Sequence, residues 1–275
     1  MSRPVLVDTH AHLMLDRFDP DREAVLRRAQ EAGVAAVVNI GFDLETAEGA
    51  IRLAEVYPSC WATVGLHPHE AERWGPALAE RLRKLAEHPK AIAIGEAGLD
   101  YYRNRSPRER QVEALIGQIQ LARELSLPLV VHNREATEDL LNLIEAYADG
   151  VPVLLHCFSD DRSAMERAAA LGCFFGLGGP VTYPRSEALR EAVAAMPADR
   201  ILLETDAPWL PPQPVRGKRN EPAYVRFTAE VVAQVRREPV AVLARRSTQN
   251  AERFFGRRLI PPDHSEDGSW NAGSS

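Results

Sequence analysis

The stretch LVVHNREATEDLLNLIEAYADGVPVLLH, residues 129–156, contains two short apolar runs that end in His132 and His156. Short apolar runs without strict polar alternation are typical of parallel strands that are covered on both faces. The segment between them, residues 135–148, has the apolar spacing of an amphipathic helix. This stretch therefore predicts a strand, a crossing helix and a second, parallel strand.

The same strand–helix unit recurs along almost the whole chain. The predicted strands are Val5–Asp8, Val34–Ile40, Trp61–Gly65, Ala91–Gly95, Leu129–His132, Val153–His156, Phe174–Gly178 and Ile201–Glu204. Helical start and stop signals stand between them, such as Asp19-Pro20 before one helix and Gly33 after it. Helices are expected at about 21–32, 44–57, 76–87, 106–125, 135–148, 161–171, 185–195, 223–236 and 239–254.

Eight strands that alternate with helices over about 250 residues predict a (β/α)8 TIM barrel. A doubly wound open sheet is the alternative fold on this pattern. We expect residues 1–259 to form one barrel domain. Residues 260–275 are polar, aperiodic and rich in Gly and Ser, so we expect them to form a mobile tail, including His264.

The composition is that of a globular protein, with 45% hydrophobic and 26% charged residues. Cys60, Cys157 and Cys173 form no C-x-x-C pair, which fits buried thiols in a reducing compartment. The N-terminus has no apolar signal segment, and no window reaches the ~18 apolar residues of a membrane span. We therefore expect a cytoplasmic enzyme that does not enter a membrane. The oligomeric state stays open, and a monomer is compatible with the sequence.

Six potential metal ligands lie at or just past the carboxyl ends of predicted strands. They are His10, His12, Glu96, His132, His156 and Asp206. In a (β/α)8 barrel these strand ends converge on one face, where active sites are built. Residues two apart in an extended segment point to the same side, so His10 and His12 can bind one cation. A single histidine at a strand end is usually structural, but six ligand-type residues at the same relative place predict a metal site.

Seven stretches carry a family resemblance. They are VDTHAHL (7–13), VGLHPHEA (64–71), IGEAGLDYYR (94–103), PLVVHNREA (128–136), LLHCFSDD (154–161), LLETDAPWLPPQPVRGKRNEPAYV (202–225) and NAERFFG (250–256). In order and spacing they resemble the TatD family of metal-dependent deoxyribonucleases, which belongs to the amidohydrolase-like metal barrels. Asn133, Asp160 and the turn Gly178-Gly179-Pro180 depart from the family pattern without replacing a ligand.

The resemblance implies two divalent cations. His10, His12 and Asp206 would hold one, His132 and His156 the other, and Glu96 would bridge them. Asp206 and Glu96 are then the catalytic residues, and Asp206 orients or deprotonates the attacking water. Four imidazoles favour Zn²⁺ or Mn²⁺, whereas the family is described as Mg²⁺-dependent, so the metal is Mg²⁺, Mn²⁺ or Zn²⁺.

The implied function is 3′→5′ exodeoxyribonuclease activity on single-stranded DNA or frayed ends, with RNA as a further substrate. The alternative keeps the metal site but hydrolyses an amide or ester, as a D-aminoacyl-tRNA deacylase does. A third hypothesis is a metal-binding barrel without activity, and the complete ligand set argues against it. The net charge of −6 gives no support to nucleic-acid binding, although bound cations would supply local positive charge.

Substrate contacts are predicted around the ligands. The candidates are His67, Arg103, Arg216, Lys218 and Arg219. The basic stretch 216–220 is the best electrostatic footprint for a polyanionic strand, although an internal ion pair to Glu221 or Glu204 is expected for at least one arginine. Glu204 and His69 are expected to support ligands or to be structural. The rings of Trp209 and Tyr183 could stack on bases or simply pack.

Overall fold

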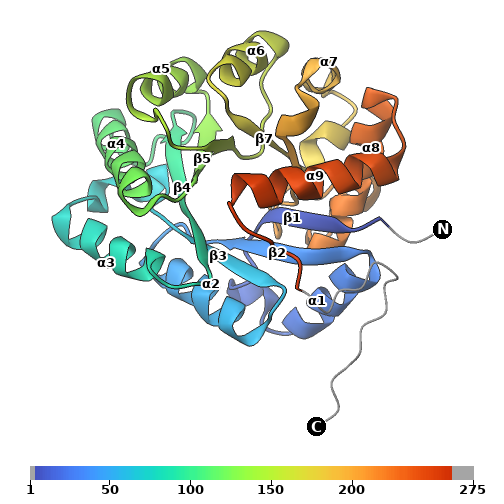
Figure 1. Ribbon diagram of the computed structural model, residues 1–275, viewed down its shortest axis with the longest axis horizontal. Helices are drawn as coiled ribbons and strands as arrows, with labels where there is room; N and C mark the ends of the chain where they lie inside the picture. The colour runs from blue at the N-terminus through green and yellow to red at the C-terminus, as the bar shows by residue number, and fades with distance from the viewer. Residues whose placement is uncertain (1–3, 262–275) are drawn as a thin grey trace.

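A computed structural model of the chain describes residues 4–261, and within them eight strands form one parallel sheet in sequential order. The strands are β1 (Leu6–Ala11), β2 (Val34–Ile40), β3 (Cys60–Val64), β4 (Ala91–Asp100), β5 (Leu129–Arg134), β6 (Val153–Leu155), β7 (Phe174–Leu177) and β8 (Ile201–Leu203). Figure 1 shows the helices arranged around these strands. The predicted (β/α)8 barrel is confirmed.

A helix follows each strand, and one further helix ends the described chain. The helices are α1 (Arg22–Glu31), α2 (Leu44–Val56), α3 (Pro76–Ala86), α4 (Arg108–Leu125), α5 (Thr137–Tyr147), α6 (Arg162–Ala170), α7 (Glu187–Ala195), α8 (Val225–Arg236) and α9 (Val240–Phe254). Local signals set their ends: the Asp43 side chain accepts a hydrogen bond from the Thr46 main-chain N–H at 2.8 Å and caps α2. In the described residues no helix is both long and apolar enough to span a bilayer.

The barrel is closed by contacts between β1 and the segment that follows β8. Ala11 and Ala207 form a parallel bridge, and the main-chain N–H of Asp206 donates to the carbonyl of His10 at 2.8 Å. The N–H of His12 donates in turn to the carbonyl of Ala207, also at 2.8 Å. This closure separates the fold from an open doubly wound sheet, and it is made by the segments that carry three of the predicted ligands.

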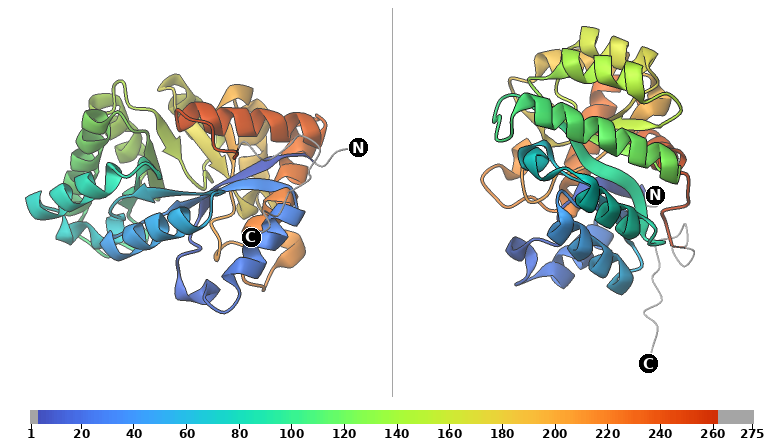
Figure 2. Two further views of the ribbon diagram at one scale, coloured as in Figure 1. Left: turned by 60° about the horizontal axis from the view of Figure 1, so that its bottom comes forward. Right: turned by 90° about the vertical axis from the view of Figure 1, so that its left-hand side faces the viewer.

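The amino-terminal end of the barrel is filled by apolar side chains and covered by α9. Interior side chains such as Val38, Val130 and Leu202 form one buried cluster with Phe254 and Phe255. The start of β1 lies beside α9 in both turned views of Figure 2, where Thr248 donates to the carbonyl of Val5 at 3.2 Å. Because apolar side chains fill this end, we expect a functional site at the carboxyl ends of the strands.

Three strands continue beyond their predicted ends. The prediction that Glu96 leaves its strand was wrong, because β4 continues to Asp100 through pairing with β5. The extension places Gly98 opposite His132 and Asp100 opposite Arg134. Of the predicted tail, 260–275, residues 262–275 lie outside the described part of the chain.

Candidate metal centre

The six predicted ligands converge at the carboxyl ends of the strands. Their donor atoms belong to three overlapping groups, each within 4.8 Å: His10–His12–Asp206, His10–Glu96–His156 and His67–Glu96–His132. The sequence-based ligand set falls entirely within these groups. His67, predicted as a substrate contact, joins them as a seventh member.

The group His10–His12–Asp206 forms one half of the centre at the barrel seam. Nε2 of His10 and Nε2 of His12 are 3.2 Å apart, and Oδ1 of Asp206 lies 3.4 Å from the latter. Asp206 has a positive φ of 58°, a left-handed conformation that a β-branched residue would not tolerate and that Asp adopts more readily. Its main-chain N–H bond to His10 fixes this conformation and turns the carboxylate toward the two imidazoles.

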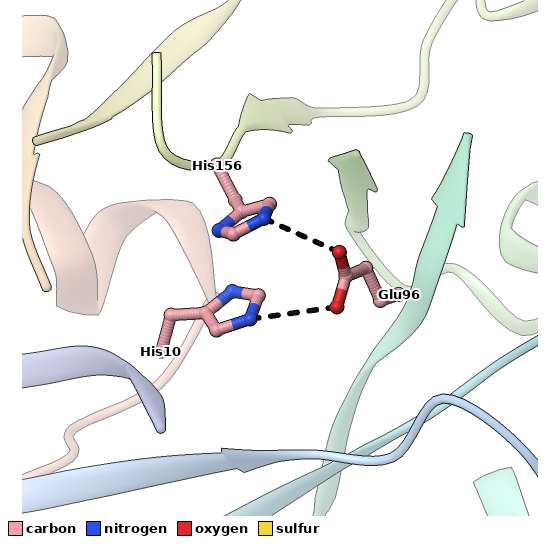
Figure 3. Close-up of side chains that lie close together, drawn as sticks. All are labelled: His10, Glu96 and His156. Atoms are coloured by element: carbon pink, nitrogen blue, oxygen red, sulfur yellow. Dashed lines mark ion pairs between the residues drawn. The ribbon is translucent and has the colours of Figure 1, made fainter. Parts of the chain in front are cut away.

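Glu96 lies between the two halves of the centre. Figure 3 shows its carboxylate with one oxygen toward His10 and the other toward His156. Oε2 is 3.5 Å from Nε2 of His10, whereas Oε1 is 3.2 Å from Nε2 of His156 and 2.9 Å from Nδ1 of His132. Since each oxygen serves a different set of histidines, the carboxylate has the geometry of a bridging ligand.

The donor set fits divalent cations. Nδ1 of His12 lies 2.9 Å from the carbonyl of Ile40, which can only accept, so this nitrogen carries a proton. In the neutral ring the lone pair is then on Nε2 and faces the other ligands. Nδ1 of His156 lies 3.1 Å from Oε1 of Glu204, which accepts a hydrogen bond from it in the same way. In the neutral ring the lone pair is therefore on Nε2, which faces Glu96. Facing lone pairs repel unless a proton or a metal ion lies between them.

The protonation of the centre without metal follows from this crowding. Burial would raise the pKa of Glu96, but the charge of His156 and hydrogen bonds from the histidines lower it well below its usual range. Burial would lower the pKa of His156, but Glu96 and Glu204 raise it well above its ordinary value. Burial and the nearby His156 lower the pKa of His10. A proton on His156 therefore occupies a place that a cation would take.

His67 differs from the other histidines of the centre. Its Nδ1 accepts a hydrogen bond from the main-chain N–H of His69 at 3.1 Å. Burial lowers the pKa of His67 well below its ordinary value, so the ring is neutral. The proton of the neutral ring is then on Nε2, which points at Oε1 of Glu96 from 3.6 Å. The arrangement suits a hydrogen-bond donor better than a metal ligand.

Two carboxylates of the centre were missed by the sequence analysis. Asp100 lies 2.7 Å from Nε2 of His69 and 3.4 Å from Nε2 of His132. Asp8 is fully buried and accepts hydrogen bonds from the main-chain N–H and the hydroxyl of Thr205 at 2.9 and 2.6 Å. Strand alternation was the signal for both, because they lie an even number of residues from ligands on the same strands.

Glu204 supports His156 through a contact that depends on a glycine. Its Oε1 also accepts the main-chain N–H of Cys157 at 2.7 Å, and the side chain is completely buried. A Cβ atom at Gly176, in β7, would lie 2.1 Å from Oε2 of Glu204. The absence of a side chain at Gly176 therefore makes room for the carboxylate that fixes the ring of His156.

The predicted cationic contacts fall into two kinds. Arg219 is engaged inside the protein: its guanidinium is 2.8 Å from Asp21 and lies over the ring of Phe18 at 4.5 Å. Its ion-pair partner is thus Asp21, and the suggested Glu221 pairs instead with Arg28. The side chains of Arg103, Arg216 and Lys218 are exposed, and within residues 4–261 no carboxylate lies within ion-pair distance of them.

Two of the residues that depart from the family pattern, Asn133 and Asp160, contact each other. Nδ2 of Asn133 donates to Oδ2 of Asp160 at 2.9 Å, and the hydroxyl of Thr137 donates to the same oxygen at 2.8 Å. Asn133 directly follows His132, and Asp160 lies in the segment after His156. The hydrogen bond therefore ties together the segments that carry two of the predicted ligands.

Comparison with known proteins gives consistent matches over nearly the whole chain. A family model described as TatD related DNase matches residues 7–256. The uncharacterized metal-dependent hydrolase YabD of Bacillus subtilis is 39% identical over 252 residues, which cover 91% of this chain and 99% of that protein. The 3′-5′ ssDNA/RNA exonuclease TatD of Erwinia tasmaniensis is 40% identical over 257 residues, with 91% and 99% covered.

Solved structures show the same architecture. The crystal structure of YJJV, a TatD homologue from Escherichia coli, superposes with a TM-score of 0.86 at 33% identity, covering 91% of this chain and 98% of the other. A TatD-family hydrolase from Entamoeba histolytica gives a TM-score of 0.83 at 22% identity, covering 92% and 98%. The second likeness bears on the fold alone.

Proposed function

The chain belongs to the TatD-related DNase family, whose members include metal-dependent hydrolases, and we propose that it removes nucleotides from the 3′ end of single-stranded DNA or RNA. The observation that carries the proposal is the position of Glu96, whose two oxygens face two different sets of histidines. A pair of cations on either side of one carboxylate is the arrangement that clamps both oxygens of an in-line phosphoryl displacement.

We infer that His10, His12 and Asp206 hold one cation and that His132 and His156 hold the other. Bound cations would neutralise charge on the phosphate and make a water molecule more acidic. Orienting and deprotonating the attacking water requires a side chain of the protein. Asp206, with 14% of its side chain exposed, is the ligand carboxylate most open to solvent and can orient and deprotonate the attacking water.

His67 completes the arrangement as a donor to the substrate. Its Nε2–H points toward the centre of the cluster, and the neutral ring keeps this proton at physiological pH. A fixed hydrogen-bond donor beside a phosphate stabilises the negative charge that develops on a non-bridging oxygen. The geometry therefore favours the role predicted for His67 from the sequence over that of a seventh ligand.

The test is degradation of an end-labelled strand. A 5′-labelled single-stranded DNA or RNA incubated with the protein and Mg²⁺, Mn²⁺ or Zn²⁺ should shorten stepwise while keeping its label. Glu96→Gln, which keeps the shape but removes the bridging charge, should lower kcat by about a thousandfold or more. Elemental analysis of the loaded protein should give two divalent ions per chain.

Two outcomes would overturn the proposal. One is that no strand is shortened with any of the three metals, and the other is that shortening persists in Glu96→Gln. A D-aminoacyl-tRNA assayed in parallel covers the alternative: its hydrolysis by a protein that leaves strands intact would assign the metal centre to ester hydrolysis.

A further inference from the structure

Two exposed aromatic residues lie in chain segments that carry residues of the metal centre. In residues 4–261 the exposed large hydrophobic side chains are Val56, Tyr102, Tyr147, Trp209 and Val242. Trp209 is 42% exposed, and the centroid of its ring lies 4.9 Å from that of His12, in one half of the centre. Tyr102 is 55% exposed and follows Asp100, which contacts His132 in the other half.

Trp209 is held in place although its ring is exposed. Its main-chain N–H donates to the carbonyl of Asp206 at 2.8 Å. Its carbonyl accepts from Nδ2 of the buried Asn220 at 2.7 Å, which also binds the carbonyl of Thr205. The ring therefore stands on main chain that is fixed to a catalytic segment, and its exposure does not come from a loosely attached loop.

Tyr102 is anchored in a comparable way. The turn that carries it is fixed by Asp100, whose Oδ1 accepts the main-chain N–H of Arg103 at 2.7 Å. The guanidinium of Arg134 lies over the Tyr102 ring at 4.0 Å. One carboxylate thus sets the position of the ring and contacts a predicted metal ligand.

One cation lies at Tyr102, and another lies in the loop that contains Trp209. The guanidinium of Arg134 lies over the ring of Tyr102, and that of Arg216 lies over the ring of Tyr183 at 4.3 Å. In the described part of the chain neither arginine has a carboxylate within ion-pair distance. Exposed aromatic rings beside unpaired cations are the combination that proteins use to hold single-stranded nucleic acid, since every base has a face that can stack.

We propose that Trp209 and Tyr102 are stacking platforms for the two bases on either side of the scissile linkage, with Arg216 and Arg134 contacting the adjoining phosphates. The proposal rests on the exonuclease function proposed above and specifies how the strand lies: across the metal centre, from the loop after β8 to the ends of β4 and β5. Stacking does not distinguish bases or sugars, so the arrangement fits a nuclease without sequence preference.

The test combines aromatic substitutions with strands that lack single bases. On an intact strand Trp209→Ala and Tyr102→Ala should each raise KM about tenfold, whereas Trp209→Phe and Tyr102→Phe should keep most of the affinity. For the wild type, an abasic residue at the last or next-to-last position should raise KM similarly, and one in the middle of the strand should not. On a strand that lacks the base stacked by the substituted ring, the KM of each alanine variant should equal that of the wild type on the same strand.

Tyr147→Ala is the matched control, because Tyr147 is also 42% exposed but lies at the end of α5, away from the centre. Alanine variants that behave like this control, or a wild type that accepts terminal abasic residues without loss, would overturn the proposal. The comparison of intact and abasic strands uses only the wild-type protein, so it tests the proposal even if a variant fails to fold. If the wild type shortens no strand at all, the exonuclease function itself fails, which is a separate result.

Discussion

His156 and His67 point the same ring atom, Nε2, at the same oxygen of Glu96, from 3.2 and 3.6 Å. They differ in what lies behind the ring. Nδ1 of His156 faces the carboxylate of Glu204, an acceptor, whereas Nδ1 of His67 faces the main-chain N–H of His69, a donor. In the neutral rings Nε2 of His156 therefore presents a lone pair and Nε2 of His67 presents a proton.

From this difference we infer that the hydrogen-bond partner of one ring nitrogen sets which role the other nitrogen can take. A ring supported by an acceptor is prepared for a cation, and a ring supported by a donor is prepared for an anion such as a phosphate. His12, supported by the carbonyl of Ile40, belongs with His156. Proximity alone would have placed all three among the metal ligands.

The strongest test of this comparison replaces the two histidines separately. His156→Ala should lose one of the two proposed cations and lower kcat by about a thousandfold or more, because it removes a proposed ligand. His67→Ala should keep both cations and lower kcat by about a hundredfold, because it removes only a donor to the substrate. Elemental analysis and steady-state kinetics on a labelled strand measure both effects.

His88→Ala is the control for these variants, since His88 lies outside the cluster and pairs with Glu55 at 3.3 Å. Metal content and activity should both stay at the wild-type level. Loss of a cation from His67→Ala would contradict the assigned proton position and make His67 a ligand.

A second test changes the support of His156 without touching the ligand. Gly176→Ala places a Cβ atom 2.1 Å from Oε2 of the buried Glu204, so the carboxylate must leave its position behind His156. We expect metal affinity to fall about 10- to 100-fold, the usual cost of losing such a partner. Gly178→Ala is the matched control, because its Cβ would lie 3.6 Å from Cγ of the same glutamate, an ordinary contact. Equal metal affinities in the two variants would show that Glu204 does not support the ligand.

A third test uses pH. In the protein without metal, Glu96 and Glu204 outweigh burial and raise the pKa of His156 well above its ordinary value of 6.5. The stability from this proton is fully present below pH 6.5 and is lost as the pH rises through the raised pKa. The melting temperature of chelator-treated protein should therefore fall as the pH is raised above 6.5, and His156→Gln should weaken this dependence.

Apparent metal affinity should rise over the same pH range, because the cation displaces the proton. A flat melting profile in the wild type would rule out the protonated His156.

The sequence predicted the barrel and the convergence of the six candidate ligands, because both follow from local rules. The apolar runs give the strands, and the ends of parallel strands meet on one face, so His10, Glu96 and Asp206 could be brought together without knowing any distance. The side of the strand followed from alternation. These rules do not depend on how the loops fold.

The support of each ligand could not be predicted in the same way. Asp100 enters the centre because β4 continues past its apolar run, and that extension is fixed by pairing with β5. The proton position on His67 depends on one main-chain N–H in a short turn. Arg219 pairs with Asp21, 198 residues away, which no local pattern indicates. Such details depend on the packing of distant segments.

Two arginines in the loop after β8 differ in the same way as the two histidines, and the smallest effect is expected from replacing them. The guanidinium of Arg219 is satisfied by Asp21, and that of Arg216 is exposed without a carboxylate partner in the described residues. Arg216→Ala should therefore raise KM for a strand about threefold at low salt and reduce its dependence on salt, because one phosphate contact is lost. Arg219→Ala should instead lower the melting temperature and leave the salt dependence unchanged, because its ion pair lies inside the protein. Measuring KM at several salt concentrations for both variants distinguishes the two arginines. If both variants change the salt dependence equally, then Arg219 binds substrate despite its ion pair with Asp21.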